Sequence, residues 1–361
     1  MVALSGFRAF LKRKNIEISL RRYGIDALGA MAQGLFCSLL IGTILNTLGS
    51  QTGVAIFSTV GGYATAVSGP AMAVAIGYAL KCPPLVLFSM VPVGWAANAL
   101  GGSAGGPLAV FVIAIVAAEV GKMVSKETPV DVLVTPLVTI FAGVALAALI
   151  APPIGAGANY VGALIKRATV LQPFWMGIIV SASVGIALTL PISSAAICHS
   201  FNLVGLAGGA AVAGCCANMV GFAVMSFREN RWGGLVSQGL GTSMLQMGNI
   251  VKNPRIWLPA ILTSMITGPI ATCVFKLEMN GAAINSGMGT CGLCGPIGVW
   301  TGWVNPSDVA LADGAAVIAP GATDWLGLAL VCFVLPAVIC WALGLFFRRI
   351  GWIREGDLKL D

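Results

Sequence analysis

Charged residues are scarce in this sequence, and their scarcity excludes a soluble globular protein. Asp, Glu, Lys and Arg make up 9% of the 361 residues, whereas soluble domains contain roughly 25%. The two longest stretches without any of them are residues 27–80 and 168–227. Because roughly 20 apolar helical residues cross a hydrocarbon core about 30 Å thick, each stretch is long enough for two crossings. The sequence therefore predicts an all-α, polytopic membrane protein.

The motifs of soluble enzymes are also missing. The sequence contains no Walker lysine motif, no HExxH, no GxSxG and no kinase signature. Cys291 and Cys294 have the CxxC spacing of a zinc or redox site, but no second CxxC and no nearby His completes a four-ligand set. We therefore expect no catalytic residue, no metal and no cofactor.

The net charge of +7 lies mainly at the chain ends and in short loops. Basic residues beside a membrane helix stay on the cytoplasmic side and are attracted to lipid headgroups. This pattern predicts cytoplasmic termini and contact with membrane lipid, and nucleic acid is not an expected partner. Residues 1–23 mix apolar residues with basic ones, which is typical of an amphipathic helix on the membrane surface.

Five apolar segments separated by short breaks make up the first half of the chain. Crossings are expected at residues 24–48, 53–80, 83–99, 107–123 and 130–151. Residues 155–172 are too short and too polar for a crossing and indicate an interfacial connector. The expected organisation is therefore a first membrane half at 24–154, a second at 173–350, and a cytoplasmic tail at 351–361.

Glycine and proline interrupt the apolar segments of the second half. Crossings are expected at residues 174–190, 203–227, 257–275 and 326–347. A re-entrant hairpin is expected in the region after Pro191. Simple alternation from a cytoplasmic N-terminus places Arg228 and Arg231 outside unless this region also supplies an extra pass.

The most informative local sequence is 280–295, because its glycines disfavour a lipid-facing helix. Backbone groups freed at membrane depth need protein, water or a ligand as partners. We expect a cavity-lining segment that enters the membrane and returns on the same side. The alternative is close packing of these glycines against a neighbouring helix.

Polar residues in these interrupted segments are the candidate solute ligands. They are His199, Asn202, Gln246, Asn280, Asn285, Ser286 and Thr290. His199, the only histidine, is either a partner for a polar solute or a neutral imidazole bonded to a helix carbonyl. We expect His199, Asn202, Asn285 and Thr290 to face one water-accessible cavity. The alternative for each polar residue is an interhelical hydrogen bond.

Several motifs carry a family resemblance. The stretch Ala118–Asp131, followed by Val134-Thr135-Pro136, resembles the inner loop of the membrane IIC components of the bacterial phosphotransferase system, in particular the subgroup that includes perfringolysin-regulator-type proteins. The similarity extends over most of the chain, through residues 68–78, 189–197, 221–230, 239–247, 253–257 and 286–290.

This resemblance implies about ten membrane helices plus re-entrant hairpins, in a homodimer of the bacterial plasma membrane with separate IIA and IIB partner proteins. The first half would be the scaffold, and the second would bind and translocate a small polar solute, a carbohydrate by class, by alternating access. The alternative is a membrane sensor or regulator that retains the IIC fold without net transport.

The sequence departs from complete sugar permeases in two respects. No IIA or IIB domain and no phosphoacceptor His or Cys is evident, so we expect at most the membrane component of a sugar phosphotransferase. The acidic residue that sugar-type IIC proteins often place in the site has no clear counterpart in the sequence.

Overall fold

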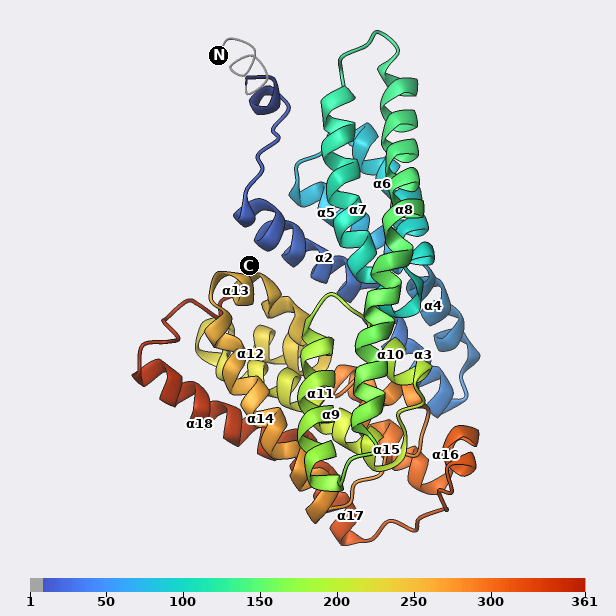
Figure 1. Cartoon of the computed structure of the whole chain (residues 1–361), viewed down its shortest axis with the longest axis vertical. Coiled ribbons are helices and arrows are strands. Elements are labelled where there is room, and N and C mark those ends of the chain that lie inside the picture. The colour runs from blue at the N-terminus through green and yellow to red at the C-terminus, as the bar shows by residue number, and fades with distance from the viewer. Residues whose placement is uncertain (1–8, 361) are drawn as a thin grey trace. The chain divides into compact units, whose positions relative to one another are not determined.

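The computed structural model describes residues 9–360, which form helices joined by loops (Figure 1). Within that range, the only extended pairing is an isolated antiparallel bridge between Gly205 and Met279. Six helices in the described residues are long and apolar enough to cross a membrane, or up to seven if a bent pair is counted as one crossing. A multi-pass, all-α architecture is thus confirmed, and the expected count of about ten helices is larger than this number.

The six long helices differ in length from the expected crossings. They are Arg22–Thr52, Gly102–Val124, Asp131–Ala168, Gly205–Met225, Pro254–Val274 and Ala322–Arg349. The bent pair consists of α4 (Ala55–Ala66) and α5 (Ser68–Ala79), which meet at 50°. The apolar helices α6 (Pro84–Leu100) and α9 (Pro173–Thr189) are shorter than a full crossing. Counting these two as crossings explains part of the larger number expected from sequence.

The chain divides into two compact units. Unit 1 combines the residues up to Gly42 with Gly62–Gly157, and unit 2 combines Thr43–Gly61 with the residues from Ala158 onward. The last of the three points at which the chain passes between the units, after Gly157, therefore lies inside α8 (Asp131–Ala168). An interfacial connector at 155–172 was expected, but most of it continues this helix to Ala168, because its apolar residues extend the helical pattern of 131–154.

Residues 43–61 also differ from the expected division, because they belong to unit 2. Thr47 Oγ1 lies 3.2 Å from Cys294 Sγ. A Cβ atom added to Gly292 would meet the Ile44 side chain at 2.3 Å, so this glycine permits the close approach.

Unit 1 is built around α5, which packs against α2 (Leu28–Leu35), α6 and α7 (Gly102–Val124). A Cβ on Gly69 would lie 2.4 Å from the carbonyl oxygen of Gly94, so only glycine allows α5 and α6 to approach this closely. The π-helical segments η1 (Arg22–Ala27) and η2 (Phe36–Leu40) flank α2.

The N-terminal region is not the continuous amphipathic helix expected from its sequence. Residues 1–8 of that prediction lie outside the described residues; residues 9–13 are helical and residues 16–19 have no regular structure. Asn15 adopts a left-handed conformation (φ 55°) that ends the first helical segment. The Arg22 Nη1 atom donates to Asn15 Oδ1 at 3.0 Å, and Lys122 Nζ donates to its carbonyl at 3.1 Å. These bonds favour the turn over a helix.

Unit 2 is organised around α11 (Gly205–Met225), which packs against α9, α14 (Leu258–Pro269) and α18 (Leu335–Arg349) (Figure 1). Helix α11 is buried along almost its whole length. Inside the bundle, Asn218 Nδ2 donates to Gly214 O and to Ser264 Oγ, both at 3.1 Å. Buried polar groups of this core are thus bonded to one another, as a low-dielectric interior requires.

Shorter elements make up the rest of unit 2, some lying between the long helices and some forming part of them. They are α10 (Ser194–Ser200), α12 (Phe227–Val236), η3 (Ser237–Gly241), η4 (Ser243–Gln246), α13 (Met247–Lys252), η5 (Pro254–Trp257), η6 (Ile270–Val274), η7 (Ala283–Gly287), η8 (Cys291–Leu293), α15 (Cys294–Val304), α16 (Asp308–Ala312), α17 (Ala322–Ala329) and η9 (Leu330–Val334). Residues 280–295 thus contain two short 3-10 turns and the start of α15.

Candidate functional site

The chain reverses direction after η6 and runs beside the start of α11. Met279 and Gly205 exchange two backbone hydrogen bonds, each of 3.0 Å. Gly205 has φ +65°, a conformation that glycine adopts without strain. A Cβ on Gly209 would lie 1.7 Å from the carbonyl oxygen of Leu277, so a glycine is needed there for the two segments to touch. These contacts place Glu278 and Asn280 beside the first turn of α11.

A second segment, following α15, closes over this region. Ser307 N donates to Asn280 O and Ser307 Oγ donates to Gly281 O, both at 2.9 Å. Ser307 Oγ also accepts a hydrogen bond from Ala310 N and so caps α16. One serine therefore joins the reversing segment to the helix that covers it.

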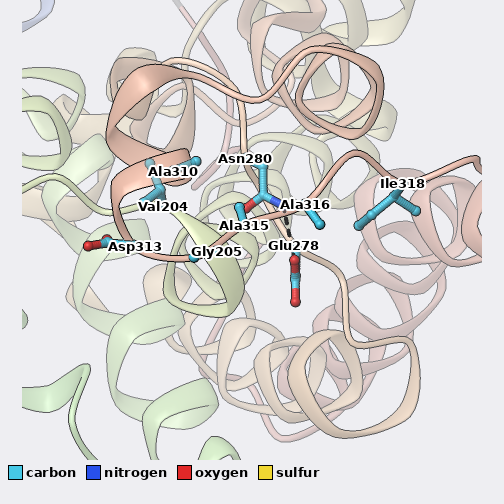
Figure 2. A pocket seen from close by; sticks show the side chains of 10 residues that line it. Val204, Gly205, Glu278, Asn280, Ala310, Asp313, Ala315, Ala316 and Ile318 are labelled. Atoms are coloured by element: carbon cyan, nitrogen blue, oxygen red, sulfur yellow. Dashed lines mark hydrogen bonds between the residues drawn. The ribbon is translucent and has the colours of Figure 1, made fainter.

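Between these segments lies a cavity of about 450 Å³. Figure 2 shows its lining residues, which come from residues 204–205, 278–280 and 310–318. Val204, Ala310, Ala315 and Ile318 supply apolar walls. The volume is within the usual range of small-molecule sites, roughly 300–1,000 Å³.

The polar groups of the cavity are few and of specific kinds. Asn280 Nδ2 donates to Glu278 Oε2 at 2.9 Å (Figure 2). Asn280 is 1% exposed, and its Oδ1 atom has no hydrogen-bond partner among the described residues. Asp313 adds a second, exposed carboxylate. Carboxylate and amide groups between apolar walls can orient the hydroxyl groups of a polar solute.

Of the residues predicted to bind solute, only Asn280 lines this cavity. His199 and Asn202 are exposed at the end of α10 and just beyond it, and Asn285 is half-buried. A Cβ on Gly298 would lie 2.6 Å from Asn285 Cβ, which shows how closely that asparagine packs on α15.

Ser286 and Thr290 are buried and bonded to the backbone of unit 2. Ser286 Oγ donates to Leu203 O at 2.5 Å, and Thr290 Oγ1 donates to Gly239 O at 2.5 Å. In this conformation both hydroxyl groups donate their hydrogen bonds to backbone carbonyls of the protein, so they do not donate to a solute.

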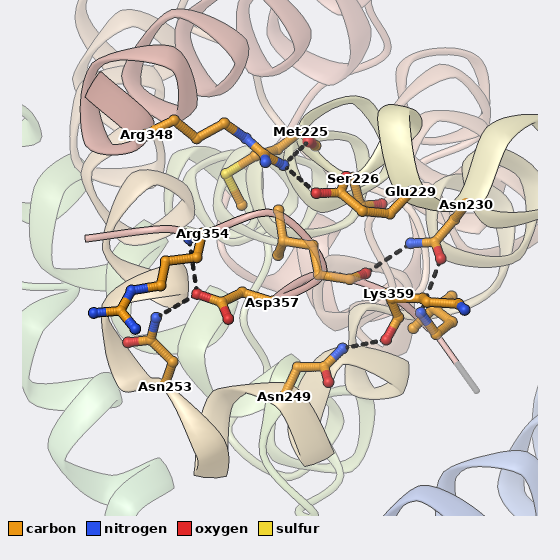
Figure 3. A network of polar contacts seen from close by, with 12 residues as sticks. Met225, Ser226, Glu229, Asn230, Asn249, Asn253, Arg348, Arg354, Asp357 and Lys359 are labelled. Carbon is orange, nitrogen blue, oxygen red and sulfur yellow. Dashed lines mark hydrogen bonds and ion pairs between the residues drawn. The ribbon is translucent and has the colours of Figure 1, made fainter. Parts of the chain in front are cut away.

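Gln246 is fully buried in a network that holds the end of the chain. Its Nε2 atom donates to Gln238 Oε1 and to Leu358 O, both at 2.9 Å, and its Oε1 atom accepts from Asn249 Nδ2 at 2.8 Å. Figure 3 shows the neighbouring contacts of this network, in which Asn249 Nδ2 also donates to Lys359 O. Gln246 therefore fixes the C-terminal segment in this conformation.

Sequence reasoning did not select Glu278 or Asp313 as site residues. One signal was present: Glu278 is the last charge before the charge-free stretch 279–307, and an ionisable group at the edge of such a stretch suggests a functional site. For Asp313 we see no comparable signal, because its position depends on the return of the chain after α15.

Comparison with known proteins agrees with the membrane architecture. Residues 25–360 match the family described as "Phosphotransferase system, EIIC". The chain belongs to the EIIC family. No curated protein and no solved structure matches it. An EIIC protein is the membrane permease component of a sugar phosphotransferase system, which works with IIA and IIB proteins. The apolar helices described above are those of a multi-pass membrane protein of this kind.

Proposed function

We propose that this EIIC protein binds a small hydroxyl-rich solute, a carbohydrate by class, in the cavity beside Glu278 and Asn280. The observation that carries the proposal is the Glu278–Asn280 pair, which lines a cavity of about 450 Å³ between apolar walls. A carboxylate accepts hydrogen bonds from sugar hydroxyls, and an amide can both donate and accept. Hydrogen bonds to a charged group contribute about 1.5–3 kcal/mol each.

The finer features that we propose are transport by alternating access and assembly as a homodimer. All residues that line the cavity belong to unit 2. A solute site within one of two compact units supports movement of that unit relative to a scaffold. His199, Asn202 and Asn285 would then contact the solute, or line its path, in another conformation of unit 2. The proposed location is the plasma membrane of a bacterium, with separate IIA and IIB proteins as partners.

Binding can be tested on the purified protein with a panel comprising a hexose, a hexitol, an amino sugar, a sugar acid and a disaccharide. Tryptophan fluorescence and thermal shift would report binding. Glu278→Gln and Asn280→Ala should weaken binding of the responding sugar at least about tenfold, as expected for the loss of one strong hydrogen bond. Asp308→Asn removes the same charge from an exposed residue outside the lining and should bind normally. If all three variants bind the sugar with equal affinity, the proposed site is wrong.

Transport is tested separately, by uptake of the same sugar into sealed vesicles with and without phosphotransferase proteins. Uptake that is lost in Glu278→Gln supports a permease. Binding without uptake under either condition would instead favour the second candidate, a perfringolysin-regulator-type membrane sensor that retains the IIC fold.

A further inference from the structure

Unit 1 contains a cavity of about 390 Å³ with a strongly basic lining. Its walls come from the N-terminal turn, the loop between α5 and α6, and the loop after α7. Five cationic side chains and one carboxylate line it: Arg13, Lys14, Lys81, Lys122, Lys126 and Glu127. We call this the basic cavity.

A buried lysine joins the chain segments that form the walls of the basic cavity. The Lys122 side chain is 1% exposed. Its Nζ atom lies 2.7 Å from Glu119 Oε2 and donates to the carbonyls of Asn15 and Leu80 at 3.1 and 3.2 Å. Arg22 Nη2 donates to the same Leu80 carbonyl at 2.7 Å. Lys122 thus joins α7 to the N-terminal turn and to the loop between α5 and α6.

Each of these three segments contributes a left-handed residue to the basic cavity. Asn15, Lys81 and Lys126 have φ values of 55°, 57° and 62°. At Asn15 and Lys81 this conformation ends a helical segment, because Ile16 N donates to Leu11 O at 2.9 Å and Cys82 N donates to Gly77 O at 3.0 Å, the bonds of a common helix C-cap. Two of the three are lysines with exposed side chains, so these turns place two ammonium groups in the lining of the basic cavity.

Those two lysines differ from the other cations in that their side chains form no ion pair, although Lys126 N donates to Asp131 Oδ1 at 2.7 Å. Lys14 Nζ lies 2.5 Å from Glu127 Oε1, and Arg13 Nη2 lies 2.7 Å from the same atom. The exposed side chains of Lys81 and Lys126 make no ion pair or hydrogen bond with any described residue. The single lining carboxylate is already shared by two cations, so the basic cavity carries an excess of positive charge.

Exposed apolar and aromatic residues lie close in sequence to the residues that line the basic cavity. Ile18 and Leu20 follow the N-terminal turn and are 84% and 73% exposed. Tyr78, three residues before Lys81, is 77% exposed. Tyrosine and lysine exposed beside an apolar surface are typical of the membrane interface.

We propose that the basic cavity binds the phosphate group of an anionic ligand, either the headgroup of an anionic phospholipid or a free phosphate ester. The rim ammonium groups of Lys81 and Lys126 supply the attraction, while Lys122 and Glu119 keep the walls in place. The site lies wholly in unit 1 and is independent of the solute cavity in unit 2.

The test uses Lys81→Asn/Lys126→Asn in the full chain. Asparagine removes both charges and tolerates the left-handed conformation, so a loss of binding is not an effect of backbone strain. Lys81→Arg/Lys126→Arg keeps the charges. Lys12→Asn/Lys166→Asn is the matched control, because it removes two exposed lysines outside the lining.

Two probes separate the sources of phosphate. Native mass spectrometry with phosphatidylglycerol, and with zwitterionic phosphatidylcholine for comparison, reports headgroup binding. Calorimetric titration of inorganic phosphate in detergent reports free phosphate. Lys81→Asn/Lys126→Asn should weaken binding of the responding probe at least about tenfold, since each basic residue near an anionic surface contributes measurably to affinity. The arginine variant and the matched control should bind as the unaltered protein does.

Which of the two probes the protein binds determines whether the proposal holds and which ligand it concerns. Selective binding of phosphatidylglycerol assigns the site to a lipid, and binding of inorganic phosphate alone assigns it to a soluble ester. Binding of neither probe, or an equal loss in the asparagine variant and the matched control, would overturn the proposal.

Discussion

Arg348 and Glu229 form an ion pair of 2.7 Å that joins the end of α18 to α12. The exposed fractions of the two side chains are 15% and 6%, and Arg348 also donates to Met225 O at 3.3 Å. Removing one partner of a buried pair leaves the other charge without compensation, which costs about 3–5 kcal/mol. We therefore expect Arg348→Ala to destabilise the protein strongly, measured as the loss of monodisperse protein on heating in detergent.

The neighbouring residue provides the control for this prediction. Arg349 is exposed, so Arg349→Ala should change stability by no more than about 0.5 kcal/mol. Replacing both partners by methionine should be less harmful than Arg348→Ala alone, because no buried charge is then left unpaired. Equal stability of Arg348→Ala and Arg349→Ala would show that the pair contributes nothing.

The C-terminal segment should lose its protection when Asn253 is truncated. Asn253 Nδ2 donates to Asp357 Oδ2 at 2.8 Å (Figure 3) and to Trp352 O at 2.9 Å. Asn253→Ala removes both bonds, at a cost of about 1–3 kcal/mol. Amide hydrogen exchange of residues 351–360 should become faster while that of α11 is unchanged. Asn305→Ala, a control at an exposed residue, should leave residues 351–360 protected. Equal exchange rates of residues 351–360 in the two variants would show that Asn253 does not hold this segment.

The long helices could be predicted from the sequence because a bilayer requires little more than apolar composition over sufficient length. The charge-free stretch 168–227 contains α9 and α11, and 326–347 lies within the last long helix. Helix ends were less predictable. Residues 155–168 continue α8 although their polarity suggested an interfacial segment, because composition does not show where a helix leaves the membrane.

Most of the candidate site could not be predicted from the sequence. A polar side chain in an apolar segment can bond either to a solute or to another group of the protein, and the sequence does not distinguish the two. Ser286, Thr290 and Gln246 were selected by the same reasoning as Asn280, yet their side chains bond to protein groups. Which partner a hydroxyl or amide meets depends on tertiary contacts. Likewise, the bridge between Gly205 and Met279 that positions Glu278 joins residues far apart in sequence.

The attachment of the N-terminal turn should depend on pH through Glu127. A hydrogen bond from Lys14, together with the nearby Arg13, holds the pKa of the Glu127 carboxyl below its usual value. A depressed folded-state pKa means that the stabilisation is present above the unfolded pKa, about 4.3, and is lost as pH falls through the folded value. The turn should therefore stay attached at neutral pH and loosen in acid.

A spin label at position 12 can report this transition. With the exposed Cys37 and Cys273 replaced by serine, a label on Lys12→Cys should become more mobile only below about pH 4. Glu127→Gln removes the titrating group, so in that variant the label should be mobile at all pH values tested. An acid transition that persists unchanged in Glu127→Gln would assign the effect to another group.

The central contact of unit 2 depends on the absence of a side chain at Gly214. A Cβ there would lie 1.9 Å from the carbonyl oxygen of Ser181 and 2.5 Å from its carbonyl carbon. Both are backbone atoms of α9, which cannot move aside without displacing the helix. Gly214→Ala should therefore destabilise unit 2 by about 1–3 kcal/mol or more, and it should also abolish sugar binding if the cavity beside α11 is the solute site.

Gly29, in α2 of unit 1, is the matched control, because a Cβ at this position would meet nothing within 4 Å. Alanine is the better helix former by up to about 1 kcal/mol, so Gly29→Ala should preserve or raise the temperature at which the purified protein loses its monodisperse peak. Gly214→Ala should lower that temperature. If Gly214→Ala is as stable as Gly29→Ala, α9 and α11 do not pack as closely as described, and the position of the cavity relative to α11 must be revised with them.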